Sequence, residues 1–106
     1  MTEDQIYQEA ANAAAMATHD MVNRNPDTWY PCGFAWVNIK PARGKFVSYL
    51  KTHHLGSTDS YAGGYTIWNP SNHPTQWMDA KMAGARAFAA VLRKYDIKAT
   101  AYERMD

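Results

Sequence analysis

The chain has 106 residues, of which 46% are hydrophobic, and its formal net charge is +1. A chain of this length supports one hydrophobic core, so we expect a single folded domain over residues 1–106 rather than a disordered chain. The near-neutral charge excludes the marked basic excess of a module that binds duplex nucleic acid and the acidic excess of a nucleic-acid mimic.

Three sequence features bear on cellular location. The apolar runs are shorter than the ~20 residues that a membrane span needs. The segment Met1-Thr2-Glu3-Asp4 is acidic and lacks the basic-then-apolar order of a signal peptide. Cys32 is the single cysteine, so no internal disulfide can form. We therefore expect a cytoplasmic protein without a membrane partner.

The first predicted element is a helix over residues 2–23. Thr2 is followed three residues later by Gln5, which is typical of a capping box at a helix start. Apolar residues then recur at helical spacing, namely Ile6, Ala10, Ala13, Ala17 and Met21. This alanine-rich face predicts close packing in the core, and a contact between subunits is the alternative.

The best strand candidate spans Phe34–Lys40. Its first residues are apolar on both faces, as expected of a central strand. A short helix follows, with three apolar residues on one side: Phe46, Val47 and Leu50. The stretch from His53 to Gly64 is polar and contains Gly and Ser, so we expect a mobile loop.

Two further strands and the longest helix complete the predicted order. The strands span Gly64–Trp68 and Ile97–Glu103, and the helix runs from about Thr75 to Lys94. Its buried stripe comprises Met78, Met82, Ala85, Ala89 and Leu92. The order α-β-α-β-α-β predicts an α/β domain in which helices pack on a small three-stranded sheet.

The predicted connections also bear on strand direction and assembly. Helical connections favour parallel neighbouring strands in right-handed crossovers. A sheet of three strands has little surface and two open edges, so we expect a homo-oligomer.

Two strand-to-helix connections supply the candidate ligand site. If the first two strands are parallel, both connections lie at the same end of the sheet, where open α/β sheets bind ligands beside helix N-termini. The first offers Lys40, Arg43 and Lys45 beside a glycine, a composition that suits a phosphate or carboxylate. The second offers mostly hydrogen-bonding groups: Asn69, Ser71, Asn72, His73, Thr75 and Gln76. Trp68 and Trp77 flank the second connection and are candidates for stacking on a planar ring.

A structural interpretation of the same residues remains open. On this interpretation Ser71 or Thr75 merely caps the following helix and the cations are solvated. The lack of a Walker-type or dinucleotide fingerprint in the chain favours it. Cys32 precedes a strand rather than a helix, so we expect a small buried residue rather than a thiol nucleophile. Metal binding by His53-His54 is disfavoured because adjacent side chains converge poorly on one ion. We therefore predict no catalytic residue, metal or cofactor.

Aromatic residues surround the start of the first predicted strand: Trp29, Tyr30, Phe34 and Trp36. We favour core packing for this group. Base stacking is the alternative, with Trp29 and Tyr30 as its candidates because they lie outside the strand proper.

Several segments resemble a short family of uncharacterised proteins from tailed bacteriophages. These segments are Pro31-Cys32-Gly33-Phe34-Ala35-Trp36-Val37, Ile39-Lys40-Pro41, Trp68-Asn69-Pro70-Ser71, Thr75-Gln76 and the helix that precedes Arg104-Met105-Asp106. The resemblance covers about residues 29–106. It implies an accessory phage protein in the host bacterial cytoplasm and carries no activity with it.

These observations lead to three functional hypotheses. The first is a non-catalytic oligomer that binds an anionic, nucleotide-like small molecule, which in a phage would suit sequestration of a host defence signal. The second is a small enzyme that acts on a nucleotide or phosphoester with His73 as acid or base. The third is a protein–protein inhibitor of a host enzyme. On the first hypothesis Arg43→Ala weakens binding about tenfold or more, because a hydrogen bond to a charged group contributes about 1.5–3 kcal/mol.

Overall fold

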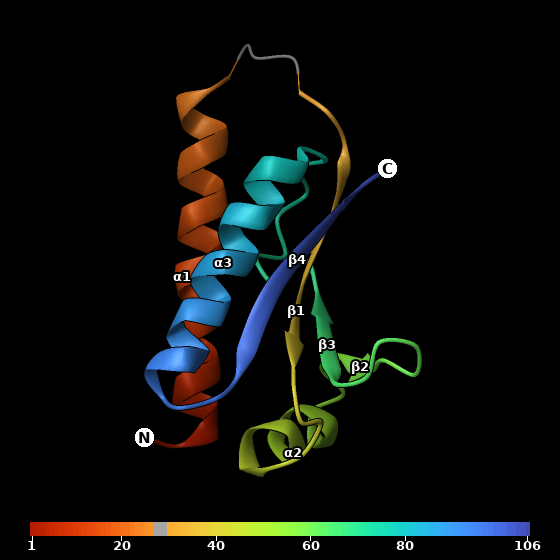
Figure 1. Ribbon diagram of the computed structural model, residues 1–106. Helices are drawn as coiled ribbons and strands as arrows, with labels where there is room; N and C mark the ends of the chain where they lie inside the picture. Colours follow the sequence, from red (N-terminus) through yellow and green to blue (C-terminus); the bar gives the residue numbers. More distant parts are fainter. Residues whose placement is uncertain (27–29) are drawn as a thin grey trace.

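The computed structural model describes residues 1–26 and 30–106. In these ranges three helices and four strands follow one another along the chain (Figure 1). They are α1 (Glu3–Arg24), β1 (Gly33–Ile39), α2 (Lys45–Thr52), β2 (Ser57–Thr58), β3 (Tyr65–Trp68), α3 (Met78–Lys94) and β4 (Ala99–Met105). None of the helices in the described ranges is long and apolar enough to cross a membrane.

Helix α1 begins with the predicted capping box. The Gln5 backbone N–H donates to Thr2 Oγ1 over 3.1 Å, and the Thr2 N–H donates to Gln5 Oε1 over 2.9 Å. The buried stripe of α1 comprises Ile6, Ala10, Ala14 and Thr18. It therefore turns toward Ala14 and Thr18 instead of following the predicted Ala13 and Ala17.

The four strands form one sheet in the order β2-β3-β1-β4, and every neighbouring pair is antiparallel. The mixed α/β class is confirmed, whereas the prediction of three strands with parallel neighbours is wrong. The additional strand, β2, has only two residues and lies inside the stretch predicted as a loop. Such a short strand leaves too little alternation to be recognised in a sequence.

The direction of β3 follows from the length of α2. A helix of eight residues rises about 12 Å, whereas a seven-residue strand such as β1 spans about 23 Å. Helix α2 is therefore too short to carry the chain back along the sheet. It lies beyond one end of the sheet (Figure 1), where the chain reverses into β2 and β3.

Helix α3 makes the one long crossover between described strands. Strands β3 and β4 each pair antiparallel with β1 and so run in the same direction, with β1 between them. The 17 residues of α3 connect them across one face of the sheet. A helical crossover between parallel strands is thus present, but it skips a strand.

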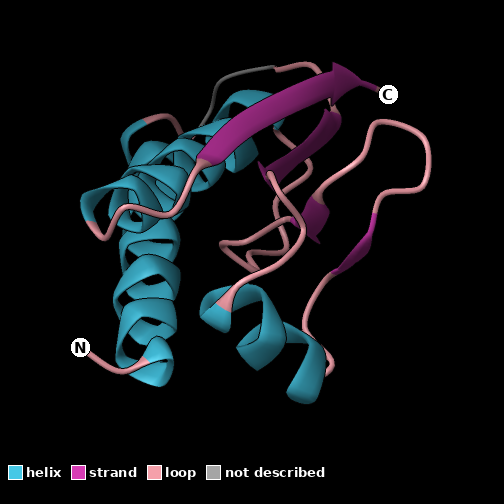
Figure 2. Cartoon of the chain, turned by 60° about the horizontal axis from the view of Figure 1, so that its bottom comes forward, coloured by secondary structure: helices cyan, strands magenta, loops and turns pink. Residues whose placement is uncertain are grey.

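The sheet has one face covered by helices and one open face. Successive side chains of a strand point to opposite faces, and in β1 the residues Ala35, Val37 and Ile39 are buried in the core with the helices. Helices α1 and α3 lie on one side of the sheet and the long β2–β3 loop projects on the other (Figure 2). Phe34 and Trp36 alternate with the buried residues and therefore point to the open face.

Helices α1 and α3 pack closely through small residues. Thr18 Oγ1 donates to the Ala80 carbonyl over 2.7 Å. A Cβ atom on Gly84 would lie 2.4 Å from Thr18 Oγ1 and 3.1 Å from the Ala14 carbonyl oxygen. Glycine at position 84 therefore sets the distance between the two helices.

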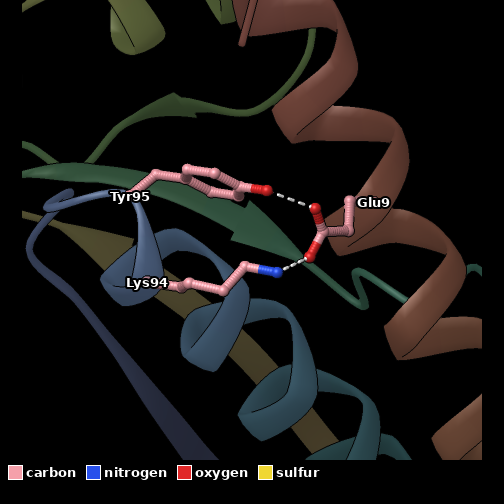
Figure 3. Close-up of polar contacts among 3 residues, drawn as sticks. All are labelled: Glu9, Lys94 and Tyr95. Carbon is pink, nitrogen blue, oxygen red and sulfur yellow. Dashed lines mark hydrogen bonds and ion pairs between the residues drawn. The ribbon is translucent and has the colours of Figure 1, made fainter.

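A polar cluster joins α1 to the end of α3 (Figure 3). The Glu9 carboxylate forms an ion pair with Lys94 and accepts a hydrogen bond from the Tyr95 hydroxyl over 2.5 Å. The hydrogen bond from Lys94 is the main cause that lowers the pKa of Glu9 below 4.5, and the bond to Glu9 raises the pKa of Tyr95 above 10.0. Burial at this cluster is slight, so its contribution to stability is small.

Candidate functional site

The two predicted ligand loops lie at opposite ends of the sheet. In the antiparallel register Ile39 pairs with Tyr65 and Trp36 with Trp68. The loop after β1 therefore begins beside the start of β3, while Asn69, which follows β3, donates its N–H to the Ala35 carbonyl over 2.9 Å. The single site at a shared end, expected from parallel strands, is not formed.

The loop after β1 carries exposed cations. Lys40, Arg43 and Lys45 are all exposed, and the side chains of Arg43 and Lys45 form no hydrogen bond or ion pair with a described residue. Helix α2 begins at Lys45, with Gly44 at its N-cap at φ 106°. All three cations thus lie at the surface of the protein.

The loop after β3 uses its polar groups internally. Asn69, at φ 44°, donates from Nδ2 to the His73 carbonyl over 3.2 Å and accepts from Ser71 Oγ over 3.2 Å. The Thr75 N–H donates to His73 Nδ1 over 3.0 Å. Thr75 Oγ1 accepts a hydrogen bond from the Trp77 N–H. The N-cap of α3 is Trp77, so neither Ser71 nor Thr75 caps this helix. The loop is mainly a folded turn.

The remaining predicted residues are divided between surface and core. Asn72 and Gln76 are exposed, and the Gln76 carbonyl accepts the Gly33 N–H. Trp77 is buried and stacks on Tyr30 with ring centroids 5.0 Å apart, so the Trp77 ring is not free to stack on a ligand. Trp29 lies outside the described residues. Among the predicted stacking residues that the structure describes, Trp68 is exposed and Tyr30 is half-buried.

A groove of about 710 Å³ lies between α1 and the loop after β3. Asn12 and Ala15 line it from α1, and Asn69 and Asn72 from the loop. It brings Trp68, Asn69, Ser71 and Asn72 of the predicted site together, but none of the predicted cations.

Four half-exposed aromatic residues gather on the open face of the sheet: Phe34, Trp36, Trp68 and Tyr102, which we call the aromatic platform. Trp36 lies directly opposite both Trp68 and Tyr102 in the register. Its ring centroid is 4.6 Å from that of Trp68 and 6.0 Å from that of Tyr102, and Phe34 meets Trp68 edge-on at 6.3 Å. Trp68 is 50% exposed and Tyr102 47%. One aromatic row thus crosses three strands.

Cations stand on two sides of the aromatic platform. Arg104 pairs with Phe34 in the register, and its guanidinium carbon lies 5.6 Å from the Phe34 ring centroid. On the other side Lys40 helps to line a hollow of about 180 Å³ against Trp36 and Tyr102. The platform therefore combines ring faces with positive charge at each end of β1.

The loop between β2 and β3 forms a wall beside the platform. Asp59 Oδ1 accepts the N–H groups of Tyr61 and Ala62, which closes a turn. Asn38 Nδ2 donates to the Gly63 carbonyl over 2.9 Å and ties the loop to β1. Asn38 is consequently buried although it points to the open face. The wall shapes the hollow that Lys40 and Asp59 line.

Sequence reasoning missed the platform because it assigned Phe34 and Trp36 to the core. The alternation along the strands could have shown the platform. Small or aliphatic residues alternate with Phe34, Trp36 and Asn38 along β1, and every second residue of β4 is Thr100, Tyr102 or Arg104. The prediction for Cys32 is also wrong, since this residue is exposed. Within residues 1–26 and 30–106 no group of His, Cys, Asp and Glu is arranged to hold a metal ion.

Comparison with family models, with curated proteins and with solved structures found no match for this chain. The resemblance to bacteriophage proteins, and the role in sequestering a host defence signal that it prompts, therefore stay predictions from the sequence.

Proposed function

We propose that the protein binds a nucleotide-like ligand, with a planar base and at least one phosphate, on the open face of the sheet. The observation that supports this proposal most is the half-exposed row Trp68–Trp36–Tyr102, which no described helix covers. Solvent-exposed aromatics on an open antiparallel sheet are a recurring means of stacking bases. This proposal keeps the expected class of ligand and moves its site to the platform.

The cations beside the platform favour a ligand that carries a negative charge next to its planar ring over a neutral ligand. Arg104 offers a planar fork of donors to a phosphate, and the exposed Lys40 adds charge at the far end of β1. The chain as a whole has a net charge of only +1. Long-range attraction to a polyanion is therefore weak, which favours a nucleotide or a short single strand over a duplex.

The enzymatic alternative gains nothing from the arrangement of His73. Its Nδ1 accepts the Thr75 N–H inside the turn after β3, and the residue is not among those that form the aromatic platform. We therefore propose binding without assigning a catalytic role to any described residue.

The test is a binding measurement with two kinds of probe. Calorimetric titration with nucleoside mono- and triphosphates detects small ligands, and fluorescence anisotropy of a labelled single strand of ~8 nucleotides detects an extended one. Stacking contributes about 1–3 kcal/mol per base, so Trp68→Ala and Tyr102→Ala each weaken binding by about fivefold to a hundredfold. Both variants stay folded, because the side chains that they remove are half-exposed.

Tyr61→Ala is the matched control. Tyr61 is fully exposed at the tip of the β2–β3 loop and lies outside the platform. Its removal leaves affinity unchanged. The proposal fails if neither probe binds at millimolar concentration, or if binding is the same in wild type, Trp68→Ala and Tyr102→Ala.

A further inference from the structure

The two edges of the sheet differ in how well they are protected. At one edge β2 has only two residues, and the chain leaves it at once for the Asp59–Gly64 loop, which is closed by its own backbone hydrogen bonds. At the other edge β4 is seven residues long and pairs only with β1 among the described strands. It crosses in front of β1, and no described segment lies over it in that view (Figure 1). A long open edge is a template for another strand.

The hydrogen bonds at both ends of β4 show which backbone groups face outward. Lys40 donates its N–H to the Lys98 carbonyl, and Asp106 donates its N–H to the Cys32 carbonyl. Hydrogen bonding alternates along an antiparallel strand, so the even-numbered residues of β4 bond to β1. The N–H and C=O groups of Ala101, Glu103 and Met105 therefore point away from β1, in the plane of the sheet and toward its open edge.

The Ala99 carbonyl also faces outward and accepts a hydrogen bond from Arg93 over 2.7 Å. A carbonyl oxygen can accept two hydrogen bonds, so this contact leaves room for a further donor. No bulge or proline interrupts the strand between Ala99 and Met105. Two of the devices that block an edge, a bulge and a proline, are therefore absent from this described strand.

We propose that β4 pairs antiparallel with β4 of a second copy of this chain, with Tyr102 opposite the partner's Tyr102. The pairing joins two four-stranded sheets into one sheet about a twofold axis. Ala101 then exchanges two backbone hydrogen bonds with the partner's Glu103, and Ala99 with the partner's Met105. Tyr102 is in a non-hydrogen-bonded position, where opposite side chains approach most closely.

Charge complementarity selects this register. With Tyr102 on the axis, Lys98 lies opposite the partner's Asp106, and symmetry supplies this ion pair twice. Moving the axis to Ala101 would place Lys98 opposite the partner's Arg104. Moving it to Glu103 would place two glutamates side by side. Like charges directly opposite destabilise a strand pair. Moving the axis to a point between two residues would shift the pairing by one residue and set core-facing residues opposite residues of the open face.

The register also extends the aromatic platform. Because the twofold axis is perpendicular to the sheet, both open faces point to the same side. The row Trp68–Trp36–Tyr102 of one copy then continues into that of the partner. Two-site binding of an extended ligand follows if the proposed function is correct, whereas the dimer itself does not depend on that function.

The first experiment measures the oligomeric state of the full chain by sedimentation velocity over about 1–500 μM, without ligand. Glu103→Pro removes the N–H that donates to the partner's Ala101 but no bond between β4 and β1. Proline is tolerated on an edge strand where its missing N–H faces solvent. Wild type sediments as a dimer and Glu103→Pro as a folded monomer. Glu103→Ala, the matched control, keeps its N–H and remains dimeric.

The second experiment tests the register by charge reversal. Lys98→Glu and Asp106→Lys each replace two attractions with two repulsions, so each weakens dimerisation by about threefold to thirtyfold. The double variant restores the wild-type constant to within about threefold. This swap keeps the proposal falsifiable should Glu103→Pro fail to fold. A monomeric wild type, a dimer that persists in folded Glu103→Pro, or a double variant no better than the single ones would overturn the proposal.

Discussion

Trp36 of β1 lies directly opposite Trp68 of β3, and their ring centroids are 4.6 Å apart on the open face of the sheet. Tyr102 of β4 extends this contact on the other side of Trp36. A contiguous apolar patch on the surface of a small protein usually marks a binding site.

The cations beside the platform affect ligand affinity, and those at the start of α2 do not. Arg104→Ala and Lys40→Ala each remove a charge next to the aromatic row, and each weakens binding of a nucleoside triphosphate by about tenfold to a hundredfold. Arg43→Ala, which the sequence alone would have predicted to be damaging, leaves affinity unchanged. Calorimetry at constant ionic strength gives the comparison. An equal loss in all three variants would mean that only overall charge matters.

The helices and the three longer strands could be predicted, but the two-residue β2 and the pairing of the strands could not. The capping box at Thr2, the strand at Phe34–Lys40 and the buried stripe of α3 are local patterns, and the structure confirms them within a few residues. Met78 is the exception in that stripe, because it is half-buried rather than buried. Strand direction depends on where α2 lies, which is a tertiary property. The sequence predicts a helical crossover between the first two strands, but the eight residues of α2 are too few to cross the sheet.

The predicted ligand site was wrong for the same reason, because it depended on parallel strands. Parallel strands would have joined Arg43 with Asn69, whereas antiparallel strands separate them. The platform instead joins residues from three strands that are distant in sequence, and the alternation around Tyr102 does not by itself show which strand lies beside β4. Once β1 pairs with β4, the alternation in both strands places Trp36 and Tyr102 on one face.

Gly84 is expected to tolerate no side chain. An alanine Cβ would lie 2.4 Å from Thr18 Oγ1 and 2.9 Å from Ser71 Cβ. Alanine gains about 1 kcal/mol in helix propensity, but overpacking costs typically 1–3 kcal/mol, and three close contacts put the cost at the upper end. Gly84→Ala therefore lowers the free energy of unfolding by about 1–2 kcal/mol, as measured by urea denaturation.

Two controls isolate the packing effect. Ala90→Gly, at an exposed position of α3, measures the propensity effect alone and destabilises by about 1 kcal/mol. In a Thr18→Ala background the nearest clash is removed, so Gly84→Ala costs less there than in wild type. If Gly84→Ala stabilises the protein by its propensity gain, the helices are farther apart than described.

Glu9 is expected to make stability depend on pH at both extremes. Its pKa is lowered below 4.5, mainly by the hydrogen bond from Lys94, so its contribution is present above pH 4.5 and lost as the pH falls through the folded pKa. The pKa values of Lys94 and Tyr95 are raised above 10.5 and 10.0, mainly by their hydrogen bonds to Glu9. Their contributions are present below those values and disappear as the pH rises through the folded pKa values.

Glu9→Gln therefore lowers the urea midpoint slightly at neutral pH, and the difference from wild type shrinks as the pH falls below 4.5 and as it rises above 10.5. High salt reduces it as well, because the cluster is exposed. Asp20→Asn is the control, since this exposed carboxylate of α1 has no hydrogen-bond or ion-pair partner among the described residues. A difference that is constant over the whole pH range would contradict the assignment.

Asn38 is expected to hold the wall of the aromatic platform in place. Its Nδ2 donates to the Gly63 carbonyl over 2.9 Å and to Thr66 Oγ1 over 3.3 Å. Asn38→Ala removes both bonds from a buried position and costs about 1–2 kcal/mol of stability. The loop then opens more often, so the backbone amides of Asp59 and Gly63, which bond across its base, exchange faster with deuterium.

Thr100→Ala separates this effect from a general weakening of the sheet. Thr100 lies opposite Asn38 on β4, is exposed, and makes no side-chain hydrogen bond to a described residue. Its replacement leaves the amide exchange of the loop unchanged. Because the loop lines the hollow beside Trp36, Asn38→Ala also raises the dissociation rate of a bound nucleotide more than it lowers the association rate. Unchanged exchange at Gly63 in Asn38→Ala would show that the turn around Asp59 maintains the wall by itself.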